Sequence, residues 1–125
     1  MATILLVSGE CGKFKEMTDA FGRHAINVMC VQTGEAALGA IRDTSCLALV
    51  VDEHLQDMAG RALIEKIIVQ NPLMNCVAVS TLSHDDFHEA YEGMGVLMQF
   101  PPVPSGKDAQ NLMDHLEKIH ALFKK

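Results

Sequence analysis

The 125-residue sequence has no tryptophan, only one tyrosine and only four prolines. None of its apolar runs reaches the ~18 residues that a transmembrane helix needs, so we do not expect membrane insertion. The amino terminus has no basic segment before its first apolar stretch, which argues against a secretory signal peptide. Basic residues are also scarce, with 10 against 16 acidic residues and a formal net charge of −6. Because nucleic acids and anionic membrane surfaces attract basic patches, the sequence argues against direct nucleic-acid binding.

The four cysteines form no Cys-x-x-Cys pair and have no zinc-ribbon spacing. Cys30, Cys46 and Cys76 lie inside apolar runs, where cysteine usually packs as a small hydrophobic residue. We therefore predict four free thiols in a reducing cytoplasm. Cys11 precedes the first predicted helix, where a thiol pKa can be lowered, and this placement leaves a redox role as the alternative.

The remaining composition is that of a globular protein, with 49% hydrophobic and 21% charged residues. The length predicts one domain over residues 1–125. Five short apolar runs are nearly unbroken by polar residues, a pattern typical of parallel strands that helices cover on both faces. These predicted strands are Thr3–Val7, Ile26–Val31, Cys46–Val51, Asn75–Val79 and Val96–Phe100.

Segments with helical periodicity separate the five runs. Thr33 and Ser83 are predicted N-caps, and Ser105 with Asp108 resembles a capping box. The predicted helices are Lys13–Arg23, Glu35–Asp43, Arg61–Gln70, His84–Glu92 and a last helix after Ser105 that buries Leu112, Leu116, Ile119 and Phe123. The alternation predicts an α/β fold of the (βα)5 type with a five-stranded parallel sheet. Ligands of such sheets bind at the carboxyl ends of the strands.

The residues at these strand ends resemble the receiver domain of two-component response regulators, including the stand-alone chemotaxis-type regulators. The resemblance covers nearly the whole chain and implies a flavodoxin-like three-layer sandwich. The segments that carry it are Ile4–Val7, Leu49–Asp52, Met58–Gly60, Ala78–Ser80 and Phe100–Pro101.

The resemblance implies roles for several residues in these segments or next to them. Asp52 stands at the phosphoacceptor position and Ser80 at the position of the switch hydroxyl. Ser8 and Gly9 replace the acidic pair that holds Mg²⁺ in the family. Phe100, followed by Pro101, replaces the lysine that contacts the phosphoryl group. Leu97 replaces the aromatic switch residue.

These replacements remove a divalent cation and a lysine from a site that must neutralise a phosphoryl group. Such a loss amounts to several kcal/mol of charge stabilisation, so we expect Mg²⁺-dependent phosphorylation of Asp52 to be slow or absent. We accordingly expect no cofactor. The alternative is a rearranged Mg²⁺ site in which Glu10, Glu53 or His54 serve as substitute ligands.

We therefore predict a receiver-like domain of the pseudo-receiver kind in a cytoplasmic phosphorelay. The domain would work through protein interactions. It would not be an enzyme beyond self-phosphorylation and dephosphorylation at Asp52. The resemblance implies a histidine kinase, a phosphotransfer protein or a downstream effector as partners, and it leaves a weak homodimer open. The family's output face would present Tyr91, Met94 and Leu97 or Met98.

The sequence leaves two alternative functions open. One is a phosphorylatable receiver with a rearranged metal site. The other is a small nucleotide- or flavin-binding α/β domain, which is disfavoured because Ser8–Gly12 matches neither Gly-x-Gly-x-x-Gly nor the P-loop.

Overall fold

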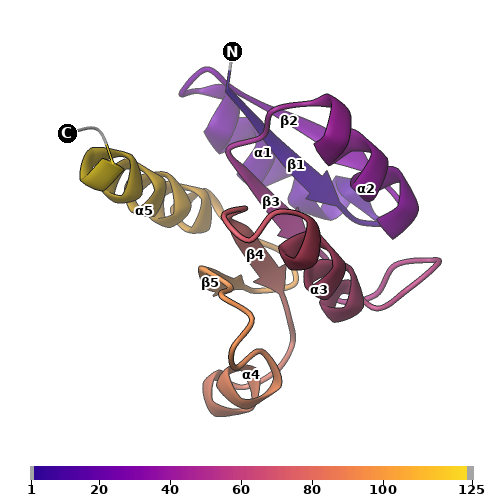
Figure 1. The fold of residues 1–125 in the computed structure, drawn as a ribbon. Helices are drawn as coiled ribbons and strands as arrows, with labels where there is room; N and C mark the ends of the chain where they lie inside the picture. Colours follow the sequence, from indigo (N-terminus) through magenta and orange to yellow (C-terminus); the bar gives the residue numbers. More distant parts are fainter. Residues whose placement is uncertain (1, 124–125) are drawn as a thin grey trace.

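The computed structural model describes the backbone of residues 2–123 and the side chains of residues 2–119. Its single sheet has five parallel strands in the order β2-β1-β3-β4-β5, with helices on both faces (Figure 1). The strands are β1 (Ala2–Val7), β2 (Ile26–Val31), β3 (Ala48–Val51), β4 (Cys76–Val79) and β5 (Met98–Phe100). The helices are η1 (Cys11–Phe14, a 3₁₀ turn), α1 (Lys15–Gly22), α2 (Gly34–Asp43), α3 (Gly60–Gln70), α4 (His84–Ala90) and α5 (Gly106–Phe123). The predicted fold class is confirmed.

The strands divide the core into two layers because successive side chains of a strand point to opposite faces. Ile4 and Leu6 of β1 pack with residues of α1 and α5, whereas Leu5 and Val7 pack with residues of α2 and α3. The central strands β1, β3 and β4 are buried almost completely. Their unbroken apolar runs are therefore explained by burial on both faces.

The edge strands differ from this expectation. The residues of β2 are half-buried or exposed, and β5 is shorter than predicted because pairing with β4 begins at Met98 rather than Val96. Of the predicted inner face of α5, Leu112 is buried and Leu116 and Ile119 are half-buried. The side chain of Phe123 lies outside the described residues.

The predicted caps are largely confirmed. The Thr33 side chain accepts a hydrogen bond from the Ala36 amide, and the Ser83 side chain accepts one from Asp86. At the start of α5, the Ser105 amide and hydroxyl both donate to the Asp108 carboxylate, at 2.8 and 3.1 Å. These bonds satisfy backbone groups that the first turn of a helix leaves without partners.

The prediction of four free thiols is wrong for one pair. Cys11 and Cys30 form a disulfide, with their Cα atoms 6.4 Å apart, whereas Cys46 and Cys76 are free. The cause is the pairing of β1 with β2, which places Leu6 opposite Cys30. The turn after β1 thus begins beside the end of β2, a juxtaposition that no sequence spacing indicates.

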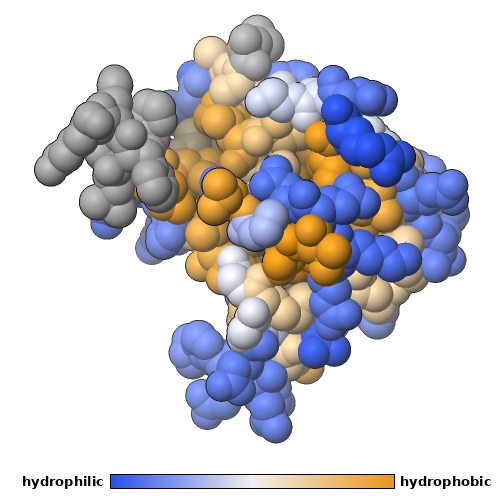
Figure 2. Space-filling view, in the orientation of Figure 1, coloured by the Kyte–Doolittle hydropathy of each residue, from blue (hydrophilic) through white to orange (hydrophobic). Residues whose placement is uncertain are grey.

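Within the described residues, no helix is both long enough and apolar enough to cross a bilayer. Hydrophilic residues cover much of the face shown in Figure 2, and apolar patches lie between them. The exposed large apolar side chains include Val69 and Leu73, near the end of α3.

Gly60 sets the distance between α3 and the end of β3. It is buried, and its amide donates to the Glu53 carbonyl at 2.9 Å. A Cβ at this position would overlap the Asp52 carbonyl oxygen. The first turn of α3 can therefore lie against the backbone of Asp52 only if residue 60 lacks a side chain.

We expect Gly60→Ala to lower the free energy of unfolding by about 1–3 kcal/mol, because an added methyl group must displace backbone in a packed region. The measurement is urea denaturation followed by circular dichroism. Gly39→Ala is the matched control, since Gly39 lies within α2 with open space at its Cβ position. That change should stabilise the protein by about 0.5–1 kcal/mol through helix propensity. Equal effects of the two substitutions would contradict the close approach.

Candidate functional site

The candidate site lies where β1 and β3 end side by side. The Ser8 amide donates to the Val31 carbonyl at 3.0 Å, and the Asp52 amide donates to the Val7 carbonyl at 2.9 Å. Strand β2 lies on one side of β1, and β3, β4 and β5 follow on the other side. The order in which the chain adds strands to the sheet therefore reverses at β1. Crevices at the carboxyl edge beside such a reversal are the usual ligand sites of this architecture.

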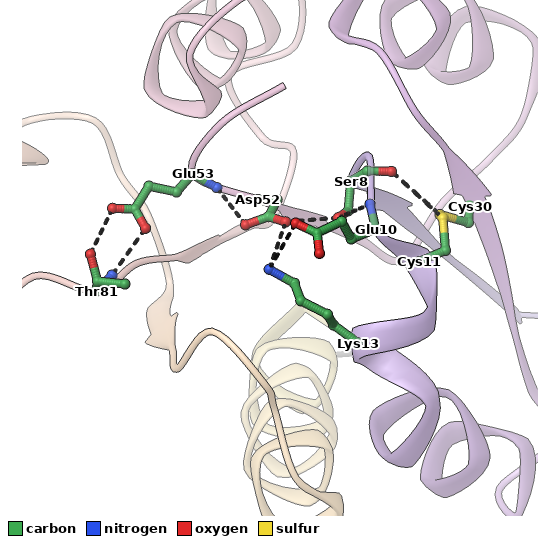
Figure 3. A network of polar contacts seen from close by, with 8 residues as sticks. All are labelled: Ser8, Glu10, Cys11, Lys13, Cys30, Asp52, Glu53 and Thr81. Carbon is green, nitrogen blue, oxygen red and sulfur yellow. Dashed lines mark hydrogen bonds and ion pairs between the residues drawn. A yellow bond between two sulfur atoms is a disulfide. The ribbon is translucent and has the colours of Figure 1, made fainter. Parts of the chain in front are cut away.

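Three groups surround the Asp52 carboxylate, which is nearly buried (Figure 3). The Ser8 hydroxyl donates to Oδ2 at 2.7 Å, and the Glu53 amide donates to Oδ1 at 2.8 Å. The Lys13 ammonium lies 3.6 Å from Oδ2. A buried carboxylate needs such partners, because removing its charge from water is otherwise costly.

Lys13 is the one member of this group that sequence reasoning missed. It lies in the 3₁₀ turn η1, next to Phe14, whose side chain is fully buried. Its ammonium also lies 3.9 Å from the Glu10 carboxylate. Periodicity placed Lys13 in the first turn of a surface helix. Only the reversal of the chain after β1 brings its ammonium over the end of β3.

The predicted substitute metal ligands do not converge on Asp52 as a set, and only Glu10 shares a partner with it, the Lys13 ammonium. The Glu53 carboxylate turns toward β4 and accepts from the Thr81 hydroxyl and amide, at 2.9 and 3.2 Å. His54 is exposed, and Glu10 is exposed with its carboxylate near Lys13. In the described part of the chain, no three acidic, histidine or cysteine side chains could hold a metal ion together.

This donor set does not fit Mg²⁺. Mg²⁺ requires near-octahedral oxygen coordination at about 2.0–2.1 Å and is usually held through one or two carboxylates. Here the one buried carboxylate at the strand ends already accepts from Ser8 and faces a lysine. A divalent cation at Oδ2 would have to displace both groups and would be repelled by the ammonium.

Ser80 and Phe100 lie at the ends of β4 and β5. Ser80 is nearly buried, and its hydroxyl oxygen accepts from the Leu82 amide at 3.1 Å. This bond caps the turn after β4, which is a structural role for the hydroxyl. Phe100 is fully buried in the core, whereas Pro101 after it is exposed. Phe100 thus packs in the core on the α1–α5 side of the sheet.

A groove of about 790 Å³ lies between α4 and β5 at the predicted output face. Tyr91 stacks on Phe87 along this groove, with ring centroids 4.6 Å apart. Burial raises the pKa of the Tyr91 phenol, and the Glu53 charge raises it further. Leu97 and Met98 are half-buried lining residues. Met94 does not belong to this surface, and that expectation is wrong, because its side chain packs into the core beside α4.

No protein-family model matches the sequence, and no curated protein matches it at a significant level. Solved structures do match. A two-component response regulator from Clostridium difficile superposes with a TM-score of 0.81 at 14% identity, over 94% of this chain and 97% of its own. A CheY-like response regulator receiver domain protein from Methanospirillum hungatei JF-1 gives 0.81 at 18% identity, over 94% and 95%. NtrX from Brucella abortus gives 0.83 at 18% identity, over 98% of this chain and 29% of NtrX.

This chain has the receiver-domain fold. At these identities the likeness establishes the fold alone, so the roles of individual site residues depend on their own geometry.

In this receiver fold, Asp57 fastens the loop after β3 to the start of α2. Its two carboxylate oxygens accept from the amides of Gly34 and Glu35, at 2.9 and 3.0 Å. These backbone hydrogen bonds hold the pKa of the Asp57 carboxyl below its ordinary value of 3.8. The loop that begins with Asp52 is thus held in two ways. The Asp57 hydrogen bonds join it to the start of α2, and a β-bridge joins His54 to Ala59 within it.

Because the folded-state pKa of Asp57 is lowered, its contribution to stability is present above the unfolded value of 3.8. That contribution is lost as the pH falls through the folded-state pKa. We expect the Asp57 carboxyl carbon to titrate below its ordinary range in an NMR pH titration. We also expect Asp57→Asn to flatten the acid side of the stability profile. An Asp57→Asn variant with the wild-type profile would contradict this assignment.

Proposed function

We propose that residues 1–125 form an atypical receiver-like domain that acts as a protein-interaction module in a phosphorelay pathway. Asp52 occupies the phosphoacceptor position of this domain. The observation that carries the proposal is the Asp52 carboxylate bound by the Ser8 hydroxyl and the Lys13 ammonium. These two groups of the protein compensate the charge of the carboxylate without a metal ion.

The proposal follows from what phosphoryl transfer requires. An acceptor carboxylate must offer a free oxygen to phosphorus, and cations must neutralise the incoming charge. Here Oδ2 is engaged by Ser8 and Lys13, and Oδ1 accepts from the Glu53 amide. One ammonium supplies a single positive charge where a divalent ion and a lysine would supply three. We therefore expect conventional phosphorylation to be slow or absent, with no resident cofactor and no other enzymatic activity.

The binding surface in this proposal is the groove between α4 and β5. Tyr91, Leu97 and Met98 offer it aromatic and apolar area, and His84 and His88 form its polar rim. Aromatic and methionine side chains are enriched at protein interfaces because they bury large areas. The partners would be a histidine kinase, a phosphotransfer protein or a downstream effector, and such partners imply a cytoplasmic location.

Lys13 also favours a second candidate function, a phosphorylatable receiver with a rearranged site. An ammonium 3.6 Å from Oδ2 could neutralise part of the charge on a phosphoryl group bound to Asp52. Ser8 would then have to release the carboxylate oxygen before that oxygen attacked phosphorus. Only the response of the site to a phosphoryl mimic separates the two functions.

We expect no saturable amide shifts when the ¹⁵N-labelled protein is titrated with millimolar Mg²⁺ and then with beryllofluoride, a mimic of aspartyl phosphate. The reason is that Ser8 and Lys13 already satisfy the carboxylate that both ligands require. Amides around Asp52, Ser80 and Leu97 are followed by two-dimensional NMR. Saturable shifts that spread from Asp52 to the α4–β5 groove would favour the second candidate.

Two variants control this titration. Asp52→Asn removes the charged acceptor, so any shift that arises at the carboxylate must disappear in it. Gly9→Asp returns an acidic side chain to the β1 end, where a Cβ meets open space. Combined with Lys13→Met, which removes the competing ammonium, this change should produce a Mg²⁺ response that the wild type lacks.

We expect Tyr91→Glu to weaken partner binding at least about tenfold, because a charge would be buried where an aromatic ring packs. The measurement is photo-crosslinking in the source cells, with a photoreactive residue replacing the exposed His88. The same residue in place of the exposed Val69 on α3 is the matched control. Equal crosslinking from both positions, or full crosslinking in the Tyr91→Glu protein, would contradict the proposed surface. Thermal unfolding of each variant checks that it is folded.

A further inference from the structure

The Cys11–Cys30 disulfide joins the turn that carries Lys13 to the edge of the sheet (Figure 3). Cys11 is the first residue of η1, two positions before Lys13, and Cys30 lies in the edge strand β2. The Cys11 and Cys30 sulfurs lie 3.6 and 4.0 Å from the carbonyl oxygen of Ser8, whose hydroxyl binds Asp52. The cross-link therefore adjoins two of the groups that hold the Asp52 carboxylate.

The other hydrogen bonds described for this turn join its own residues. The Glu10 amide donates to the Ser8 hydroxyl at 3.0 Å, and the Lys13 amide donates to the Glu10 carbonyl at 3.1 Å. Gly9 and Gly12 are exposed, with open space at their Cβ positions. Glycine makes such a segment flexible, because it restricts the backbone least. The disulfide, the buried Phe14 side chain and the Lys13–Asp52 ion pair thus attach the turn to the rest of the molecule.

The four cysteines differ in their access to a reagent. Cys11 and Cys30 are half-buried residues beside the mouth of the site. Cys76 is buried in β4, in the core on the α2–α3 side of the sheet, and burial raises its thiol pKa to about 12. Burial also raises the pKa of the Cys46 thiol. Because thiolates carry out exchange, neither free cysteine competes well for the cross-linked pair near neutral pH.

We propose that Cys11 and Cys30 form a reversible thiol–disulfide site, open to dithiol reductants, whose oxidised form holds Lys13 against Asp52. Reduction releases the glycine-containing turn and loosens the ammonium from the carboxylate. This proposal rests on the proposed function in one respect. It assumes that the Lys13–Asp52 contact determines how the Asp52 site behaves.

The exchange balances with a dithiol as co-reactant. A reductant thiolate attacks one cysteine sulfur, the Cys11–Cys30 bond breaks, and the other cysteine leaves as a thiolate that takes a proton. The second reductant thiol, as its thiolate, then attacks the mixed disulfide and releases the remaining cysteine, which is also protonated. The protein has gained two electrons and two protons, and the reductant is left as a disulfide. A disulfide of the same class reverses both steps.

The first test equilibrates the full chain in a series of dithiothreitol redox buffers, followed by alkylation and peptide mass spectrometry. We expect Cys11 and Cys30 to change state together in one transition, with no disulfide at Cys46 or Cys76. Absence of the Cys11–Cys30 disulfide in the most oxidising buffer would overturn the proposal. Cys46→Ser is the control and should leave the transition unchanged.

The second test compares hydrogen exchange and NMR spectra of the oxidised and reduced proteins. We expect amides in residues 9–13 to exchange at least about tenfold faster after reduction, since local opening depends on local contacts. The Glu53 amide, which donates to Asp52, should shift on reduction. Cys30→Ser should give the reduced-state pattern without reductant. In Lys13→Met the shift should be largely lost, whereas the matched Lys15→Met should keep it.

Equal exchange of residues 9–13 in both redox states would overturn the proposal. A full Glu53 shift in the Lys13→Met protein would also overturn it, because the effect would then bypass the ammonium. These failures are distinct from failure of the proposed function. A beryllofluoride response of the oxidised protein would reject the inert Asp52 site and leave the thiol site standing.

Discussion

The parallel pairing of β1 with β2 on one side and with β3 on the other is the constraint on which the site depends. It places the ends of three strands at one edge, so that Ser8 bonds to Val31 and Asp52 bonds to Val7. The same register puts Cys30 opposite Leu6 and within reach of the turn that follows β1. A strand slipped by one residue would turn the core side chains of β1 to the wrong faces. The hydrophobic core therefore specifies the register that assembles the site.

A nearly buried carboxylate at this edge must be compensated, and the chain does so with its own side chains. Ser8 and Gly9, at the end of β1, offer no carboxylate to a cation, and Phe100, at the end of β5, packs in the core. A hydroxyl from Ser8 and an ammonium from Lys13 take over the compensation from the β1 side. Charge compensation at Asp52 thus comes from the end of β1 and the turn that follows it. A divalent cation and Lys13 would compete for the same Asp52 oxygen, so one site would not hold both.

Hydrogen bonds also connect the Asp52 site to the ends of β4 and β5, which lie on the far side of the sheet from β2. Glu53 follows Asp52 and binds Thr81 after β4, and the Gln99 side chain of β5 donates to the carbonyls of Ser80 and Leu82. Gln99 also lines the groove beside α4. These contacts place the turn after β4 between Asp52 and the proposed binding surface. Hydrogen-bonded groups thus form a continuous connection between Glu53, the turn after β4 and the groove.

The sequence by itself determined the fold class, most element boundaries to within about two residues, and the placement of Asp52 and Ser80 at strand ends. It could do so because hydrophobic periodicity and capping residues act locally. Tertiary structure alone decided that Lys13 lies over Asp52, that Cys11 and Cys30 are joined, that Glu53 turns away to Thr81 and that Met94 belongs to the core. Each of these depends on strand order and on how a loop reverses over the sheet edge. Hydrophobic periodicity does not record such contacts. The residues that meet lie far apart in the sequence, at spacings that follow no regular pattern.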